Sequence, residues 1–179
     1  MLTLYLSLID GENDKEKFEK IYKNYSALML SRAYEILHDS SLAEDAAHNA
    51  FVRILKNIDK LDDSGSLKTK SYVMIVLENT AKTMYVKRSR QKIYELDESV
   101  PNSVNVERET ETKLTAEIVA EKIAELPEKY RDIIVLKFLN GLDDGEIASA
   151  LGISRTAVRK RLQRSREKLR ELMGGISFG

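Results

Sequence analysis

The most constraining stretch of the chain runs from Asp143 to Leu162. Asp143, followed three positions later by Glu146, has the spacing of a capping box, in which each side chain accepts from the backbone amide of the other residue. Gly152 suits a left-handed turn, because it has no Cβ to penalise that conformation. Ser154 is then placed to cap a second helix. The stretch therefore predicts two short helices joined by a tight turn.

The second of these helices is predicted to be amphipathic and strongly basic. Val158, Leu162 and Leu169 recur at helical spacing, so we expect them to face inward. The positions left facing outward are Arg155, Arg159, Lys160, Gln163, Arg164 and Arg166. A helix–turn–helix with such a face is typical of proteins whose second helix enters the major groove of DNA. The alternative is a solvated basic helix in a helical bundle.

The remainder of the chain also favours helices, since only two prolines and eight glycines occur in 179 residues. Apolar residues at helical spacing predict three helices in the first half, over residues 13–37, 41–58 and 70–90. The first is either one helix or two joined by a kink, and Ser41 with Glu44 offers a capping box for the second. No stretch alternates with the period of a strand. The predicted fold class is all-α.

The periodicity fades between residues 91 and 113, where an acidic, Thr-rich composition indicates a linker. Beyond it we expect helices near 114–125, from Pro127, and through 137–141, followed by the helix–turn–helix. The apolar N-terminal residues 2–9 are expected to pack in the core and not to form a signal peptide. The sequence therefore predicts two small helical domains, 1–91 and 114–179, joined by a flexible linker over 92–113.

A net charge of zero conceals strong segregation of charge. Residues 68–92 hold seven basic and one acidic residue, a net +6, and residues 154–172 hold eight and two, again +6. The segments around them are acidic: residues 1–67 carry eight basic and twelve acidic residues, and residues 93–153 carry six and fourteen. Two basic segments in an acidic protein fit a polyanion that is contacted at two places.

Several classes of function are disfavoured by the sequence. The chain has no cysteine, which suits a cytoplasmic protein, and no apolar run of eighteen residues, so we expect no membrane insertion. His38 and His48 have no metal-ligand spacing. No Gly-rich phosphate loop, nucleophile motif or catalytic pair of carboxylates is recognised. We therefore expect no catalytic site, no metal and no cofactor, and an enzyme is the least favoured class.

Two segments resemble the extracytoplasmic-function sigma factors of bacterial RNA polymerase, of the sigma-70 family. Residues 126–142 and the helix–turn–helix through Leu169 are similar to region 4 of that family. In region 2, residues 43–51 resemble the polymerase-binding helix and residues 72–82 the promoter-melting helix. The resemblance covers about residues 15–172. It implies a sigma factor that binds core RNA polymerase, reads a duplex −35 element and a single-stranded −10 element, and has an anti-sigma protein as partner.

The resemblance also implies roles for individual residues. For the −35 element these are Lys137, Arg155, Arg159, Lys160, Gln163 and Arg164. For the −10 element they are Ser64 and Ser66 in the loop before the third helix, with Asn79, Lys82, Lys87 and Arg88. For core polymerase they are Asp45, His48, Asn49 and Arg53. Asp143-Asp144 departs from the family, which usually carries an aromatic or hydroxyl pair there.

A different reading is a stand-alone helix–turn–helix regulator that binds duplex DNA without polymerase. Tight binding of the free protein to a palindromic site would favour that alternative, because dimers of helix–turn–helix proteins bind two symmetric half-sites. The sigma factor is favoured instead because the sequence predicts a single helix–turn–helix together with a second basic domain.

Overall fold

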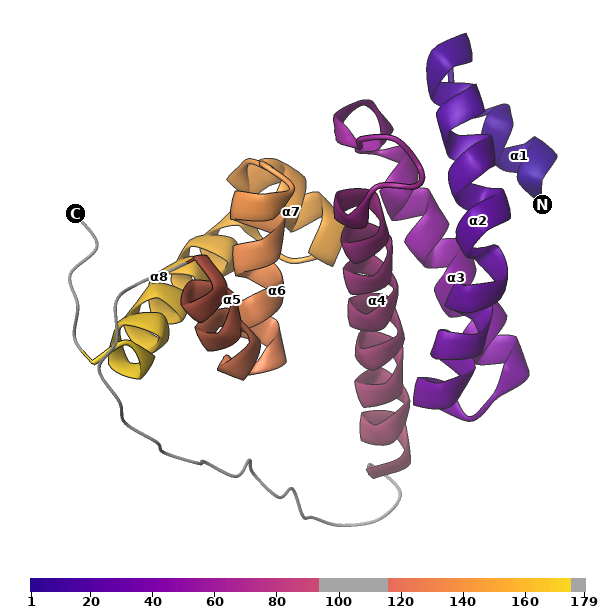
Figure 1. Ribbon diagram of the computed structural model, residues 1–179. Coiled ribbons are helices and arrows are strands. Elements are labelled where there is room, and N and C mark those ends of the chain that lie inside the picture. The colour runs from indigo at the N-terminus through magenta and orange to yellow at the C-terminus, as the bar shows by residue number, and fades with distance from the viewer. Residues whose placement is uncertain (94–115, 175–179) are drawn as a thin grey trace.

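The structure is a computed structural model of the chain, and it describes residues 1–93 and 116–174 (Figure 1). Every regular element in these ranges is helical, which confirms the predicted all-α class. The first bundle contains α1 (Leu2–Leu6), α2 (Glu12–Leu37), α3 (Ser40–Leu55), η1 (Ile58–Lys60) and α4 (Leu67–Ile93). The second contains α5 (Ala116–Glu125), α6 (Glu128–Ile134), η2 (Val135–Leu139), α7 (Asp144–Leu151) and α8 (Arg155–Leu172). Most of the predicted linker, apart from its first two residues in α4, lies outside the described residues.

The core of the first bundle lies between α2, α3 and α4. Four alanines on the inner face of α3 allow its neighbours to approach closely, and the larger buried side chains come from α2, α4 and the last turns of α3, at Phe51 and Ile54. Four rings from three helices form an aromatic cluster with centroids 5.0–6.4 Å apart, made by Tyr5, Phe18, Tyr22 and Phe51. Tyr5 thereby anchors α1 to the end of the bundle, as expected for an N-terminus that packs in the core.

Helix α2 is one continuous helix, which resolves the choice between one helix and two. It ends at His38, whose φ of 51° is left-handed. The predicted Ser41 capping box is wrong, because Asp39 is the N-cap of α3 and its side chain accepts from the Leu42 amide at 3.1 Å. The single left-handed residue turns the chain quickly enough for the next residue to cap a new helix.

Helix α4 begins at Leu67, three residues before the predicted start. The Ser66 hydroxyl accepts from the Thr69 amide at 3.0 Å, which satisfies one of the free amides at the start of the helix. Helix α3 likewise ends at Leu55, before the predicted Ile58, and the chain continues as the short helix η1. These shifts change helix ends and not the number of long helices in the bundle.

The second bundle contains the predicted helices near 114–125 and from Pro127, and both helices of the helix–turn–helix. The Asp143–Glu146 capping box is confirmed, as are the left-handed Gly152 (φ 65°) and the Ser154 cap, which accepts from the Ala157 amide at 3.1 Å. Helix α6 passes directly into the π-turn η2, so the predicted helices from Pro127 and through 137–141 form one rod. Inside, Ile133 and Leu136 pack with α7 and α8, and Leu169 joins a smaller cluster around Tyr130.

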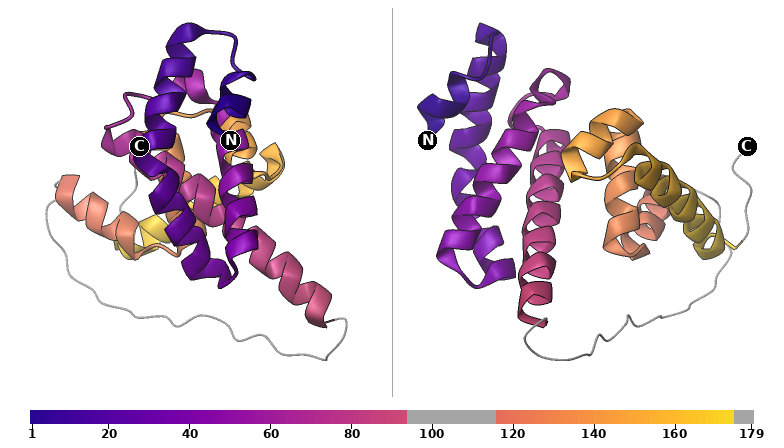
Figure 2. Two further views of the ribbon diagram at one scale, coloured as in Figure 1. Left: turned by 90° about the vertical axis from the view of Figure 1, so that its right-hand side faces the viewer. Right: turned by 180° about the vertical axis from the view of Figure 1, so that it is seen from behind.

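The two bundles pack directly against each other (Figure 2). Helix α4 lies against η2 and α7, and α3 also contacts α7. Buried apolar residues of both bundles belong to one connected cluster. Helix α4 is therefore the central element: one side packs on α2 and α3, and another faces the helix–turn–helix unit.

Candidate nucleic-acid and polymerase interfaces

The predicted −35 residues gather on the outer side of α8. Arg155, Arg159, Lys160, Gln163 and Arg164 are all exposed, and the Arg159 side chain is 72% exposed. Arg159 and Gln163 line a hollow of about 430 Å³ together with Lys137 from η2. At 3.6 residues per turn, Lys160 and Arg164 point further round the helix, directly away from the core. All six predicted residues are therefore accessible on one side of the second bundle.

An acidic residue lies within this basic face. One oxygen of the Asp144 carboxylate is 3.1 Å from the Lys137 ammonium, and the other is 3.4 Å from Nε of Arg159. The hydrogen bond from Lys137, followed by its charge and the contact from Arg159, lowers the pKa of Asp144. Arg166 lines the same hollow, although the sequence argument did not select it. The face thus contains an anion that holds two of its predicted DNA contacts.

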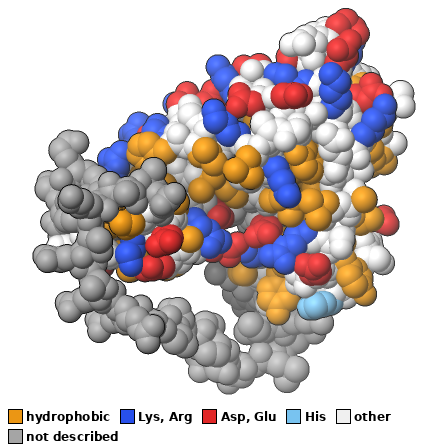
Figure 3. Space-filling model, in the orientation of Figure 1, with side chains coloured by type: hydrophobic (Ala, Val, Ile, Leu, Met, Phe, Trp, Pro, Cys, Tyr) orange, Lys and Arg blue, Asp and Glu red, His pale blue; other side chains and the backbone are white. Residues whose placement is uncertain are grey.

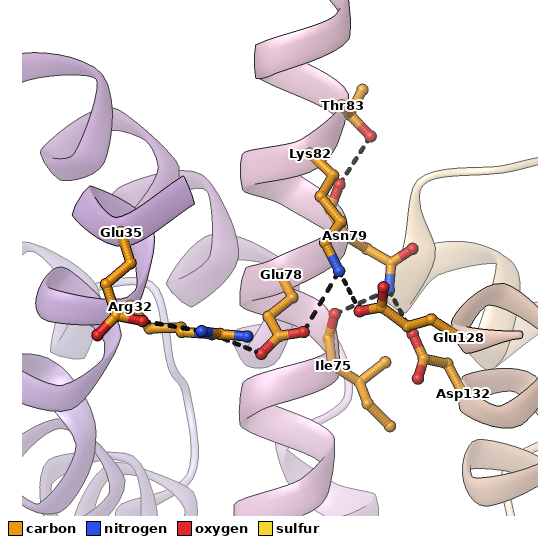
Figure 4. A network of polar contacts seen from close by, with 9 residues as sticks. All are labelled: Arg32, Glu35, Ile75, Glu78, Asn79, Lys82, Thr83, Glu128 and Asp132. Atoms are coloured by element: carbon orange, nitrogen blue, oxygen red, sulfur yellow. Dashed lines mark hydrogen bonds and ion pairs between the residues drawn. The ribbon is translucent and has the colours of Figure 1, made fainter. Parts of the chain in front are cut away.

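The predicted −10 residues on α4 do not share one surface. Asn79 and Lys82 face α6 of the second bundle, as Figure 4 shows. Arg88 points elsewhere and pairs with Asp39 before α3, at 3.1 Å. Lys87 is exposed between them. The structure therefore brings Asn79 and Lys82 together and separates them from Arg88.

The two loop serines are engaged in holding the loop. Ser64 is buried, its hydroxyl accepts from Asn24 at 3.4 Å, and its carbonyl accepts from the Tyr25 hydroxyl at 2.7 Å. Ser66 caps α4 and donates to the Thr69 hydroxyl at 3.0 Å. The Ser64 hydroxyl is therefore buried, and the hydroxyl of the half-buried Ser66 is engaged at the start of α4. The prediction came from the resemblance of this loop to the family, and the Ser/Gly-rich composition of the loop carries no information about burial.

The predicted polymerase-binding residues on α3 divide into two groups. Asp45 and Asn49 are exposed on one face of the helix. His48 is half-buried, and its Nδ1 lies 2.7 Å from the Tyr5 hydroxyl of α1. Arg53 lies one turn beyond Asn49, near the end of α3, and its guanidinium donates to the Thr80 hydroxyl at 3.1 Å. It also sits against Gly152 of the second bundle, and burial lowers the pKa of Arg53.

A polar seam joins α4 to α6, and no pattern in the sequence predicts it (Figure 4). The Asn79 amide donates to the Asp132 carboxylate at 3.2 Å, and Lys82 forms an ion pair with Glu128. Asp132 is only 6% exposed, and this burial raises its pKa to about 6. On the face in Figure 3, acidic and basic side chains intermingle between the bundles. Both acids of α6 thus contact residues predicted to bind promoter DNA.

The described residues offer little support for other kinds of site. Within 1–93 and 116–174, no three acidic, histidine or cysteine side chains lie close enough together to hold a metal ion. The described helices are also too short or too polar to cross a membrane. Charged faces are the most developed surface features of this part of the chain.

Both bundles are similar to known proteins. The family model described as sigma-70 region 2 matches residues 21–91, and the model of sigma-70 region 4 matches residues 116–169. The ECF RNA polymerase sigma factor SigW of Bacillus subtilis is 30% identical over 175 residues, covering 89% of this chain and 90% of its own. The sigma factor SigZ of the same organism is 30% identical over 139 residues, covering 78% and 77%. The sigma-H factor of Pseudomonas aeruginosa is 25% identical over 167 residues, covering 87% and 86%.

Proposed function

The chain belongs to the sigma-70 family of bacterial RNA polymerase factors, as an extracytoplasmic-function sigma factor, and we propose that its two bundles divide promoter recognition between them. A sigma factor binds core RNA polymerase and directs it to promoters. In our proposal the first bundle binds core enzyme and the −10 strand, and the second reads the −35 duplex. The observation that carries this division is that each bundle matches a different region of the family and carries its own basic helix.

We assign −35 recognition to the exposed side of α8. Arginine can pair bidentately with guanine, and glutamine with adenine, in the major groove. Arg159 and Gln163 are one turn apart and suit base contacts, whereas Lys160 and Arg164 suit phosphates on either side. Lys137, half-buried on η2, is assigned to a phosphate because its ammonium is a point charge without a planar fork.

We assign −10 recognition to α4. A separated strand needs polar groups for base edges and cations along the backbone. The Asn79 amide can donate and accept against a base edge, and Lys82 and Lys87 supply charge. Arg88 is a weaker candidate because Asp39 pairs with it, and we leave Ser64 out because it is buried.

We assign core polymerase binding to α3, with Asp45 and Asn49 as the exposed contacts. His48 is close to them, and Arg53 becomes available only when the second bundle moves away from it. We further propose that the chain acts in the cytoplasm as a non-catalytic subunit without metal or cofactor, since its partners are promoter DNA and polymerase. An anti-sigma protein remains a prediction from the family.

The test is run-off transcription with purified core enzyme on promoters selected by this protein from a random library. We expect a transcript only when the protein is added, and a sharp loss with Arg159→Ala. Lys20→Ala is the matched control, because it removes one exposed positive charge from α2, far from α8. Failure to bind core enzyme would refute the proposal. Tight specific binding of the free protein to a palindromic duplex would support the stand-alone regulator instead.

A further inference from the structure

The promoter-melting helix is covered by the protein's own second bundle. Two side chains that we assign to the −10 strand, Asn79 and Lys82, contact acids of α6 (Figure 4). We propose that the acidic face of α6, formed by Glu128 and Asp132, is an intramolecular ligand that competes with the −10 strand for α4. This inference rests on the proposed function of Asn79 and Lys82.

The chemistry of the two ligands is the same. A DNA strand offers anionic phosphates and base-edge acceptors, and Glu128 and Asp132 offer carboxylate oxygens to the same donors. The Asn79 side-chain amide donates to Asp132 at 3.2 Å and to its own helix, at the Ile75 carbonyl, at 3.0 Å. Both contacts use its nitrogen, so a base that needs this donor has to displace the carboxylate.

The remaining contacts between the bundles hold this arrangement in register. The Asn140 side chain of the second bundle donates to the Lys68 carbonyl of α4 at 2.9 Å. The Asn57 side chain of the first bundle donates to the Glu146 carbonyl of α7 at 3.4 Å, and its orientation is fixed by a bond to the Tyr72 hydroxyl of α4 at 2.9 Å. The two bonds that cross between the bundles end on backbone carbonyls, and such directional bonds specify one orientation of the second bundle against α4.

The seam is nevertheless suited to opening. The Lys82 and Glu128 side chains are 41% and 38% exposed, and exposed ion pairs of this kind contribute little net stability. Interfaces between domains are commonly separable, although part of this one also buries apolar residues of both bundles. We therefore expect a competing strand to displace the acids of α6 first, and core polymerase to displace the second bundle as a whole.

The covering is asymmetric. Arg159, Lys160 and Gln163 of α8 remain exposed, whereas Asn79 and Lys82 are partly exposed and their donors are engaged by Asp132 and Glu128. Arg53, assigned to core polymerase, is also held between the bundles, against Thr80 and Gly152. With the two bundles packed together, α8 is thus accessible to a −35 duplex, whereas Asn79, Lys82 and Arg53 are engaged in contacts within the protein. Binding of core enzyme would favour the open arrangement, because only that arrangement exposes all of these groups.

The first test locks the bundles together. The chain has no cysteine, so Lys68→Cys with Asn140→Cys can be joined specifically by a short bis-maleimide linker that contains a reducible disulfide. Their contact at 2.9 Å places these positions side by side across the seam, and neither is an assigned DNA contact. We expect the linked protein to bind a −35 duplex normally and a single-stranded −10 oligonucleotide at least tenfold more weakly, with recovery after reduction. Equal −10 binding before and after reduction would overturn the proposal.

The second test opens the seam from the side of α6. Glu128→Ala with Asp132→Ala leaves every assigned DNA contact in place, and should raise the affinity of the free protein for the −10 oligonucleotide about fivefold or more. The same variant bound to core enzyme should use promoters like the wild type. If the free variant gains no affinity, masking by α6 is wrong.

A third variant separates this inference from the proposed function. Lys82→Ala in complex with core enzyme tests whether α4 contacts the −10 strand at all. If it opens promoters as well as the wild type, the assignment of Lys82 fails. If it is defective while the seam variants behave like the wild type in the free protein, the assignment stands and only the masking fails.

Discussion

Substitution of Asp144 by asparagine should strengthen the binding of the second bundle to DNA. Asp144 is the first residue of α7, and its carboxylate contacts Lys137 at 3.1 Å and Arg159 at 3.4 Å. Both cations are assigned to DNA, so the carboxylate neutralises part of the charge that phosphates would otherwise meet. Asparagine keeps the size and removes the charge.

The magnitude follows from Coulomb's law. A phosphate bound by Lys137 would lie about 6 Å from the carboxylate, where two unit charges repel by roughly 0.7 kcal/mol in water and about 3 kcal/mol at an effective dielectric of 20. Salt screening at physiological strength acts over about 8 Å and reduces both values. We therefore expect a gain of about 1 kcal/mol, roughly fivefold in affinity. The cost to folding should stay below about 1 kcal/mol, because exposed pairs contribute little.

The assay is fluorescence anisotropy of the free protein on a −35 duplex and on a scrambled duplex, over a series of salt concentrations. Binding to both duplexes should tighten by a similar factor. The slope of log affinity against log salt concentration should steepen by up to about 0.9, the value for one additional phosphate contact. Glu121→Gln, which removes one exposed acid from α5, is the control for net charge and should change affinity much less. A loss of affinity on the −35 duplex alone would refute the reasoning, because it would show that Asp144 orients Arg159 toward a base.

Three further predictions concern individual residues. Arg159→Ala should lower the binding free energy for the −35 duplex by about 1–3 kcal/mol if Arg159 makes a bidentate base contact. Lys137→Ala should weaken binding to all sequences alike and lower the salt dependence of binding. An equal loss for Arg159→Ala on scrambled DNA would show that Arg159 contacts a phosphate instead. Asp132 has a folded pKa of about 6 against 3.8, with Asn79, Glu128, Arg131 and Lys82 around it. Its contribution to stability is therefore present in full below about pH 4 and lost as pH rises through 6, and denaturant unfolding at pH 4.5 and 7.5 should show that Asp132→Asn removes this dependence. Gly152→Ala should lower the free energy of unfolding by about 1–2 kcal/mol, because φ of Gly152 is 65° and the added Cβ would lie 2.7 Å from a guanidinium nitrogen of Arg53. Thermal unfolding measures this loss, and an unchanged midpoint would show that the turn relaxes.

The helix–turn–helix could be predicted from the sequence in detail. Its caps join residues no more than three positions apart, as in the hydrogen bonds from Glu146 to Asp143 and from Ala157 to Ser154. Such local interactions depend on the identity of a few neighbours and leave a recognisable pattern. The helical class and the long helices were predictable for a similar reason, since the spacing of apolar residues repeats along each helix.

The helix boundaries around α3 and the serine loop were less predictable. The start of α3 depends on a left-handed histidine, and nothing in the residue type announces that conformation at His38. Ser64 is buried because Tyr25, thirty-nine residues earlier, donates to its carbonyl. A contact over that separation depends on how the helices pack, and local composition does not report it.

The seam between the bundles also joins residues that are distant in sequence. Asn79 and Asp132 are fifty-three positions apart, and each stands at an unremarkable polar position of its own helix. Helical periodicity identifies which side of a helix is polar, but it does not identify which two polar sides will meet. The resemblance to the family suggested DNA for Asn79 and gave no partner for Asp132.

The same residues explain why an internal acid is useful to the free protein. A half-buried amide or ammonium left without a partner costs free energy, so groups shaped to bind an external strand need an alternative partner when that strand is absent. Glu128 supplies it for Lys82, together with Glu78 of α4 itself; Asp132 supplies it for Asn79, and Thr80 for Arg53. The exposed cations of α8 need no such help, because water solvates them. The contrast between the two basic helices therefore follows from their surroundings: α4 is packed between two layers and α8 lies at the surface.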